Sequence, residues 1–455
     1  MPTTGQGPRT PRRETVRPEQ RVTPRREKVR WPRQRQGSQA ATGAVLLSDA
    51  GLAAYRTCHP RSSLAIGAAL VCAGPVPDDA LLRTVLERSA AAFPALGDPE
   101  ATAGGMRYAA VDAADAAAGR WHRTLDAEAA RPLPEAGWDC TVLTGLPHGR
   151  FALLWRGDHV LLDGGGAAAV LTTLCSPEDP DEAAAFSYAA CRAPSRGGGA
   201  AAVRAVADLA RASRAVTGPL LDRGGAADRL AAVRADAPPR LRHLFAHTRL
   251  DVLRRIGHRH GATVNDVYLA ALAGALRAWA GEETADGLRA VRALCPVNIR
   301  RHREGVLRNR HLPGRVTLPV DLAAPGERLA AVAARTRGLA RALRHPVVHG
   351  VFWGLPRFLG AWCMERYFRP DRSTLLASNV RGPAHPLRLA GAPVHEVLPL
   401  NFLPAGHPLS AVLVTLNGLV SVGFTADASV RGVADLPGLW LRELEALGTA
   451  RVSGP

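Results

Sequence analysis

Short apolar runs separated by turn residues recur along the chain, and they predict a mixture of strands and helices. Continuous apolar runs at 63–72 and 151–155 predict buried strands, and shorter strands are expected at 107–111 and 141–143. The spacing of apolar positions within 75–92 is typical of a helix. These elements do not alternate strictly between strand and helix, so we expect a mixed sheet rather than a purely parallel one.

The second half of the chain carries a similar mixture of short elements. The expected elements are strands at 241–250 and 293–297, helices at 252–260, from 264 onward and at 435–447, and a hairpin that joins 411–416 to 419–424. The dipeptide Asn417-Gly418 lies between the two runs of this hairpin and favours a type I′ turn.

The stretch with the most suggestive chemistry lies between a predicted strand at 150–156 and a predicted helix at 167–174. His159 stands at the end of the strand, and an imidazole can accept and return a proton near neutral pH. Asp163 stands where the helix begins, where it either caps the first turn or pairs with a buried cation. Glycines 164–166 allow a tight turn, and N–H groups at the helix start can face an oxyanion. A strand, a turn and a helix with a bystander histidine would give the same pattern.

The spacing His159-x-x-x-Asp163-Gly164 resembles the HxxxDG motif of the CoA-dependent acyltransferase superfamily, which includes chloramphenicol acetyltransferase and nonribosomal peptide condensation domains. Segments 263–267, 295–300 and 378–383 follow in the order typical of its wax ester synthase/diacylglycerol acyltransferase branch. The resemblance extends from about residue 45 to the C-terminus. The chain departs from the pattern where Asp158 replaces the first of two adjacent histidines. It departs again where only Arg131-Pro132-Leu133-Pro134 remains of a proline-leucine-tryptophan segment.

This resemblance implies an α/β (α+β) fold of two-layer sandwiches. Two chloramphenicol acetyltransferase-like domains would form a pseudo-dimer with a channel between them. The expected division is a disordered basic tail at 1–40, a first domain at 41–195 that carries the motif, a linker with a connector helix at 196–238, and a second domain at 239–455.

The resemblance also implies roles for particular residues. His159 would deprotonate the acceptor and then protonate the leaving thiolate, Asp163 would hold the loop, and backbone N–H groups near Gly164 would stabilise the oxyanion. The motif aspartate of the superfamily commonly pairs with a distant arginine, and Arg300 is the candidate here. The residues expected at the substrate or the channel are Asp158, Asn265, Asp266, Arg300, Ser378 and Asn379.

Structural roles remain open for several of these residues. Thr263 and Asp266 have the spacing of a helix capping box, which offers another explanation of the Asn265-Asp266 pair. Ser378 and Asn379 would equally satisfy the backbone of a turn.

The implied activity is that of an O-acyltransferase, which moves an acyl group from acyl-CoA to a hydroxyl acceptor and forms an ester. One alternative is a free-standing condensation enzyme that uses donors on an acyl or peptidyl carrier protein and forms an amide or an ester. Others are a non-catalytic family member and a binding protein that acts through its basic arm. Acyl-CoA or acyl-phosphopantetheine would be a co-substrate. No bound cofactor or metal is expected, because a thioester is already activated.

Bulk properties narrow the choice of partners and compartment. The formal net charge of the 455-residue chain is +18, and about +8 of it falls within residues 1–38, so nucleic-acid binding by the folded part is not expected. None of the seven cysteines forms a Cys-x-x-Cys pair, which argues against a zinc site or a disulfide framework. The absence of an apolar run of about 18 residues and of a signal core favours a cytoplasmic protein.

An aromatic cluster at 348–368 has three interpretations in a chain that is only 5% aromatic. It would be a core helix, a wall of an acyl tunnel, or an interfacial helix at a membrane surface. The third interpretation leaves peripheral membrane contact as an open alternative.

Overall fold

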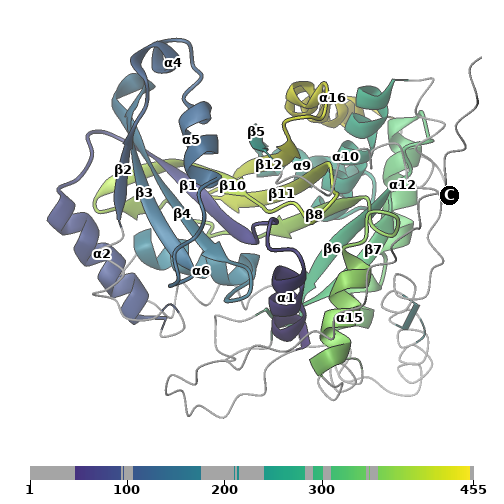
Figure 1. Cartoon of the computed structure of the whole chain (residues 1–455). Helices are drawn as coiled ribbons and strands as arrows, with labels where there is room; N and C mark the ends of the chain where they lie inside the picture. The colour runs from purple at the N-terminus through teal and green to yellow at the C-terminus, as the bar shows by residue number, and fades with distance from the viewer. Residues whose placement is uncertain are drawn as a thin grey trace, which may run out of the picture. The chain divides into compact units, whose positions relative to one another are not determined.

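The computed structural model describes residues 47–93, 106–175, 240–281, 291–300, 309–344 and 357–450, together with residues 96, 210, 213, 214 and 348. The predicted tail at 1–40 and nearly all of the predicted linker at 196–238 lie outside these residues. In the described part, strands form two sheets against which helices pack (Figure 1). Both sheets are mixed, as the apolar patterns predicted.

The first sheet contains the strand that leads into the HxxxDG segment. Its strand order is β2 (Arg107–Ala110), β3 (Trp138–Leu146), β4 (Arg150–Asp158), β1 (Ala65–Ala73), β10 (Ala392–Leu400) and β9 (Arg388–Leu389). The pair β2–β3 is parallel, and the other pairs are antiparallel. Phe151 to Asp158 of β4 are all buried, which explains why residues 151–155 form a continuous apolar run and not an alternating pattern.

The second sheet has the order β5 (Leu241–Arg249), β12 (Leu419–Asp427), β11 (Leu409–Leu416), β8 (Leu375–Val380), β6 (Arg292–Asn298) and β7 (His311–Thr317). Strands β11 and β12 form the predicted hairpin. Asn417 and Gly418 both have positive φ, 45° and 76°, as the predicted type I′ turn requires. Two parallel pairs, β11–β8 and β6–β8, make the sheet mixed.

The helices lie against these sheets. They are α1 (Leu47–Cys58), α2 (Asp79–Ala91), α4 (Ala113–Ala117), α5 (His122–Ala129), α6 (Gly164–Cys175), α9 (Leu250–Arg259), α10 (Val264–Ala280), α12 (Pro325–Thr336), α13 (Leu339–Leu343), α15 (Arg357–Tyr367) and α16 (Leu436–Thr449). Short 3₁₀ turns occupy Pro147–Gly149 and Val433–Asp435. The interior helix α10 is buried from Asp266 to Leu276 and packs against α12 and α16.

Strand β10 lies far from β1 in the sequence but pairs with it in the first sheet, with Gly67 opposite Leu400 and Leu70 opposite Val397. The predicted division at residue 239 assigns β9 and β10 to the second domain, whereas both strands belong to the sheet of the first half. The division into two domains stays a prediction. The two halves are joined by hydrogen-bonded strands.

Gly67 gives a test of the close approach of β1 and β4 in the first sheet. A Cβ atom at this position would lie 2.0 Å from the Trp155 carbonyl oxygen, so Gly67→Ala forces β1 and β4 to separate. We expect a loss of about 1–3 kcal/mol in the free energy of unfolding, measured by urea denaturation. Gly448→Ala in α16, where nothing lies within 4 Å of the added Cβ, is the matched control. Equal stability of the two variants would contradict the close approach of β1 to β4.

Candidate active site

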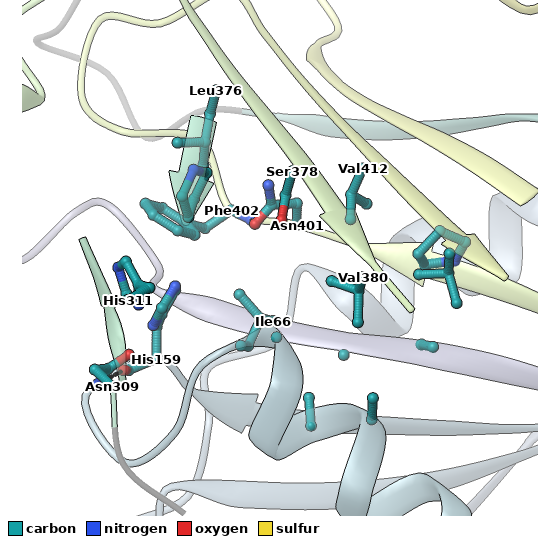
Figure 2. Close-up of a pocket in the computed structure, with 18 of the residues that line it drawn as sticks. Ile66, His159, Asn309, His311, Leu376, Ser378, Val380, Asn401, Phe402 and Val412 are labelled. Carbon is teal, nitrogen blue, oxygen red and sulfur yellow. Dashed lines mark hydrogen bonds between the residues drawn. The ribbon is translucent and has the colours of Figure 1, made fainter. Parts of the chain in front are cut away.

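A pocket lies between the two sheets and reaches the HxxxDG segment (Figure 2). Its walls come from β1, α6, β6, β7, α15, β8, β10 and β11, so both halves of the chain contribute. The lining is mainly apolar. Polar side chains in it are Ser48, His159, Thr172, Asn309, Arg310, His311, Tyr367, Ser378, Asn401 and Thr415.

His159 lines the pocket immediately after the end of β4. Its backbone is held on both sides, because its N–H donates to the Leu64 carbonyl at 3.0 Å and its carbonyl accepts from Asn309 Nδ2 at 2.7 Å. Its ring meets Phe402 edge-on, with centroids 5.4 Å apart. Burial, followed by the neighbouring His311, lowers the pKa of His159 to about 4. The imidazole is therefore neutral near pH 7 and can accept a proton.

Asp163 performs both of the roles that its position allowed. Its Oδ1 accepts from Gly166 N–H at 3.0 Å, which caps α6, and from Arg300 Nη2 at 2.5 Å. Its Oδ2 accepts from Arg310 N–H at 2.9 Å. Although burial acts to raise it, the charge of Arg300 and the contact with His311 hold the pKa of Asp163 well below its usual range. Asp163 is thus a buried carboxylate that ties the motif loop to the second sheet.

Arg300 is the predicted partner of Asp163, and this pairing is present. The guanidinium is 1% exposed, and it reaches the motif loop from the end of β6. Gly165 makes the approach possible, because a Cβ there would lie 2.8 Å from Arg300 Nη1. Gly164 lines the pocket itself, and a Cβ on it would lie 2.9 Å from Val380 Cγ2. The glycines after Asp163 therefore serve close packing.

Asp158, in the place of the first motif histidine, has a structural environment. It is buried, pairs with Arg56 of α1, and accepts from Val160 N–H at 2.9 Å. It is not among the residues that line the pocket. Its carboxylate therefore holds the turn that carries His159.

Asn265 and Asp266 also lie outside the pocket lining. Thr263 and Asp266 form the predicted capping box of α10, and Asp266 Oδ1 accepts from Thr336 Oγ1 at 2.6 Å. Asn265 accepts from Asn379 Nδ2 at 3.2 Å. The capping interpretation therefore holds for Asp266, whereas Asn265 contacts β8.

Ser378 and Asn379 point to opposite sides of β8, as neighbouring residues of a strand must. Ser378 and Val380 line the pocket, whereas Asn379 contacts Asn265 away from it. The structure thus brings together His159, Asp163, Gly164, Arg300 and Ser378 at or beside the pocket, and leaves Asp158, Asn265, Asp266 and Asn379 outside its lining.

Asn309, His311 and Phe402 line the pocket and contact His159, and the sequence reasoning missed all three. Asn309 links the His159 carbonyl to Asp49 of α1, because its Nδ2 donates to both. Figure 2 shows His311 and Asn309 beside His159 at one end of the pocket. No local pattern marks these residues, since His159, which all three contact, lies about 150 positions or more away in the sequence.

Among the described residues, no group of three or more His, Cys, Asp or Glu side chains is arranged to hold a metal ion. Within the same residues, no helix has the length and apolar character needed to cross a bilayer.

Comparison with known families identifies the class. The wax ester synthase/diacylglycerol acyltransferase catalytic domain matches residues 116–268, and the C-terminal domain of the same family matches 315–439. These two segments cover more than half of the chain. The chain therefore belongs to the wax ester synthase/diacylglycerol acyltransferase family, as the motifs indicated.

Individual relatives are more distant. A putative diacylglycerol O-acyltransferase of Mycobacterium tuberculosis is 28% identical over 326 residues, which cover 65% of this chain and 69% of the relative. Another from the same organism, also 28% identical, matches over only 37% of its own length and 38% of this chain.

Solved structures bear out the predicted fold class. The wax ester synthase/diacylglycerol acyltransferase from Marinobacter aquaeolei VT8 has a TM-score of 0.57 at 19% identity, covering 85% of this chain and 95% of that one. The starter condensation domain of rhizomide synthetase, a mutant in complex with C8-CoA, has a TM-score of 0.54 at 16% identity over 90% and 95% of the two chains. The mixed α/β fold with two sheets is that of a chloramphenicol acetyltransferase-like pseudo-dimer.

The pair of Asp163 and Arg300 gives a stability prediction. Asp163→Asn leaves a buried guanidinium without its charge partner, and we expect a loss of about 3–5 kcal/mol in the free energy of unfolding at pH 7. Urea denaturation measures it. Asp79→Asn removes an exposed carboxylate that pairs with Arg83, and should change stability little.

The difference in unfolding free energy between wild type and Asp163→Asn should also depend on pH. Because the pKa of Asp163 is lower in the folded than in the unfolded chain, its stabilisation is full above the unfolded value of 3.8 and declines as the pH falls below it. The difference between wild type and Asp163→Asn should therefore be constant from pH 7 to about 5 and narrow below pH 4. A constant difference down to pH 3 would show that the pKa of Asp163 is not lowered by folding.

Proposed function

We propose that the protein is an O-acyltransferase that moves an acyl group from acyl-CoA to a hydroxyl acceptor, with His159 as the general base. The observation that carries this proposal is a neutral imidazole on a largely apolar pocket, beside the buried pair of Asp163 and Arg300. The family to which the chain belongs is named for ester formation by acyl transfer.

The proposed reaction uses the geometry in two steps. The acceptor hydroxyl gives its proton to His159 as its oxygen attacks the thioester carbonyl carbon, and a tetrahedral oxyanion forms. The carbon–sulfur bond then breaks, and the proton on His159 passes to the leaving thiolate. Asp163 stays ionised and keeps the loop in place, and the N–H of Gly164 is the proposed donor to the oxyanion.

Acyl-CoA is the preferred donor for two reasons. An acyl chain is apolar, and the pocket walls from β1, β8, β10 and β11 are largely aliphatic. The rhizomide condensation domain, which shares the fold, was solved with C8-CoA. Donors on a carrier protein, which would make the protein a condensation enzyme, present the same thioester and remain the competing proposal.

The role of His159 is tested by thiol release. Wild type and His159→Ala receive acyl-CoAs from acetyl to palmitoyl with alcohol or amine acceptors, and free CoA is followed. We expect His159→Ala to lose about 10²- to 10⁴-fold in acceptor-dependent rate, because the base is removed while the fold is kept. His395→Gln, an exposed position on β10 outside the pocket lining, is the matched control. Full activity of His159→Ala would refute this mechanism, and activity only with carrier-bound donors would favour the condensation enzyme.

Helix α15 supports a second proposal, peripheral contact with a membrane. Gly360, Cys363, Met364 and Tyr367 of α15 line the pocket. Phe358 and Trp362 are 62% and 46% exposed, and the Arg366 guanidinium lies 4.9 Å from the Trp362 ring centroid. Exposed aromatic rings beside an arginine suit contact with an anionic lipid surface. An apolar acceptor in that lipid would be separated from the pocket only by α15.

Vesicle binding tests this surface. The double variant Phe358→Ser/Trp362→Ser should bind phosphatidylglycerol vesicles about tenfold or more weakly than wild type in a flotation assay. Leu419→Ser, which removes another exposed apolar side chain, should bind like wild type. Equal binding by all three proteins would exclude α15 as the contact, and activity on short water-soluble substrates should not change.

A further inference from the structure

The backbone carbonyl of His159 is held by a side chain from the second half of the chain. Asn309, which is 1% exposed and lies two residues before β7, donates through Nδ2 to the His159 carbonyl at 2.7 Å and to the Val160 carbonyl at 3.4 Å. The next residue, Arg310, donates its N–H to Asp163 Oδ2 at 2.9 Å. Two neighbouring residues therefore hold the two ends of the motif loop, and Figure 2 shows Asn309 beside His159.

The orientation of the Asn309 amide depends on helix α1. Asp49, in the first turn of α1, accepts through Oδ1 from Asn309 Nδ2 at 2.9 Å and from the Asn309 N–H at 3.2 Å. Ser48 Oγ donates to the Asn309 carbonyl at 2.8 Å. Because a carboxylate only accepts hydrogen bonds, Asp49 draws the NH₂ end of the amide to the side where the His159 carbonyl also lies. A flipped amide would turn its oxygen toward two acceptors.

A second contact joins α1 to the start of the same loop. Arg56, in the last turn of α1, pairs with the buried carboxylate of Asp158, which also accepts from the Val160 N–H at 2.9 Å. Asp49 and Arg56 are about two helical turns apart, so they project from one face of α1. This face therefore reaches the loop at the His159 carbonyl and at the residue that precedes His159.

Helix α1 is itself fixed against its neighbours. A Cβ atom on Gly51 would lie 2.7 Å from the Gly360 carbonyl oxygen, so the backbones of α1 and α15 touch. The Tyr55 hydroxyl accepts from the Ala405 N–H at 2.8 Å, beyond the end of β10. Leu52 is 1% exposed and lines the pocket. A helix held in this way gives the loop a fixed support.

We propose that Asp49 is a positioning residue that sets the place of His159 by fixing the Asn309 amide. Arg56 is the second anchor of the same loop. The inference rests on the proposed function for its catalytic meaning. A general base must lie within hydrogen-bond reach of the proton that it removes, and a misplacement of about 1 Å costs about 10²-fold in rate.

A first-turn aspartate also stabilises its helix through the helix dipole, whatever it contacts. Asp251 makes the same contribution in α9, where it pairs with Arg249 and Arg255 at the surface. Asp251→Ala is therefore the matched control, because it removes a first-turn carboxylate that does not reach the pocket lining.

The first test needs no activity. Hydrogen exchange of backbone amides is followed by mass spectrometry in wild type, Asp49→Ala and Asp251→Ala. In Asp49→Ala, peptides that cover 158–163 should exchange about tenfold faster, because the loop has lost the anchor that holds it against Leu64, the acceptor of the His159 N–H. Peptides of the β11–β12 hairpin should keep their wild-type rates. Asp251→Ala should leave exchange at 158–163 unchanged.

The second test follows the reaction. Asp49→Ala should lower kcat about 10- to 10²-fold with the KM for acyl-CoA little changed, because Asp49 does not line the pocket. It should add nothing in an Asn309→Ala background, since both residues act through one amide. Asp49→Asn keeps an acceptor oxygen but not the charge, so it should restore most of kcat. A role limited to the helix dipole would make Asp49→Asn as slow as Asp49→Ala.

Several outcomes would overturn the inference. Wild-type exchange at 158–163 in folded Asp49→Ala would do so, and so would faster exchange over the whole chain, which indicates a general loss of stability. If Asp49→Ala does not fold, Asn309→Ala removes the same link from its other end, and unchanged exchange at 158–163 in that variant would exclude the proposal. Absence of acyl transfer in wild type would refute the proposed function but leave the exchange result to decide whether Asp49 holds the loop.

Discussion

The buried pair of Asp163 and Arg300 is the constraint on which the site depends. Asp163 follows the strand β4 of the first sheet, and Arg300 follows β6 of the second, so this contact fixes the motif loop across the seam between them. Burying two charges costs desolvation energy that their attraction does not fully return. The pair therefore contributes geometry more than stability. The carboxylate also caps α6 and accepts from the N–H of Arg310, just before β7, so one side chain aligns the starts of α6 and β7 and the end of β6 around the pocket.

The pairing of β10 with β1 also fixes the two halves of the chain relative to each other. Its residues pair with β1 in the first sheet, whereas β8, which precedes β9 and β10 in the chain, and β11, which follows them, belong to the second. A pocket walled by β1, β10 and β11 cannot form within one half of the chain. Small displacements between the halves would move the imidazole relative to the opposite wall, because His159 lies at the end of β4 and Phe402 just beyond β10. The backbone hydrogen bonds between β1 and β10 oppose such displacement.

Local features of the fold could be predicted from sequence because their causes are local. The turn at Asn417-Gly418 and the capping box of Thr263 and Asp266 each depend on residues within four positions. The pairing of Asp163 with Arg300 came from family resemblance, and no spacing in the chain implies a contact across 137 positions. His311 and the first-sheet position of β10 were missed for the same reason. Long-range pairing is decided by which apolar faces pack together, and composition along the chain does not encode that choice.

The electrostatics of the pocket join these points to the chemistry. A base whose pKa is about 4 is neutral over the whole physiological range, but it holds a proton weakly once it has taken it. A weakly basic imidazole suits the proposed reaction, because the proton that His159 accepts must then pass to the leaving thiolate. The carboxylate of Asp163 would favour a charged imidazole, yet Arg300 and two backbone N–H groups already engage it, and it faces His311 more closely than His159. The pocket thus keeps its ionised groups on the loop side and leaves the imidazole of His159 uncharged beside the apolar wall where an acyl chain would lie.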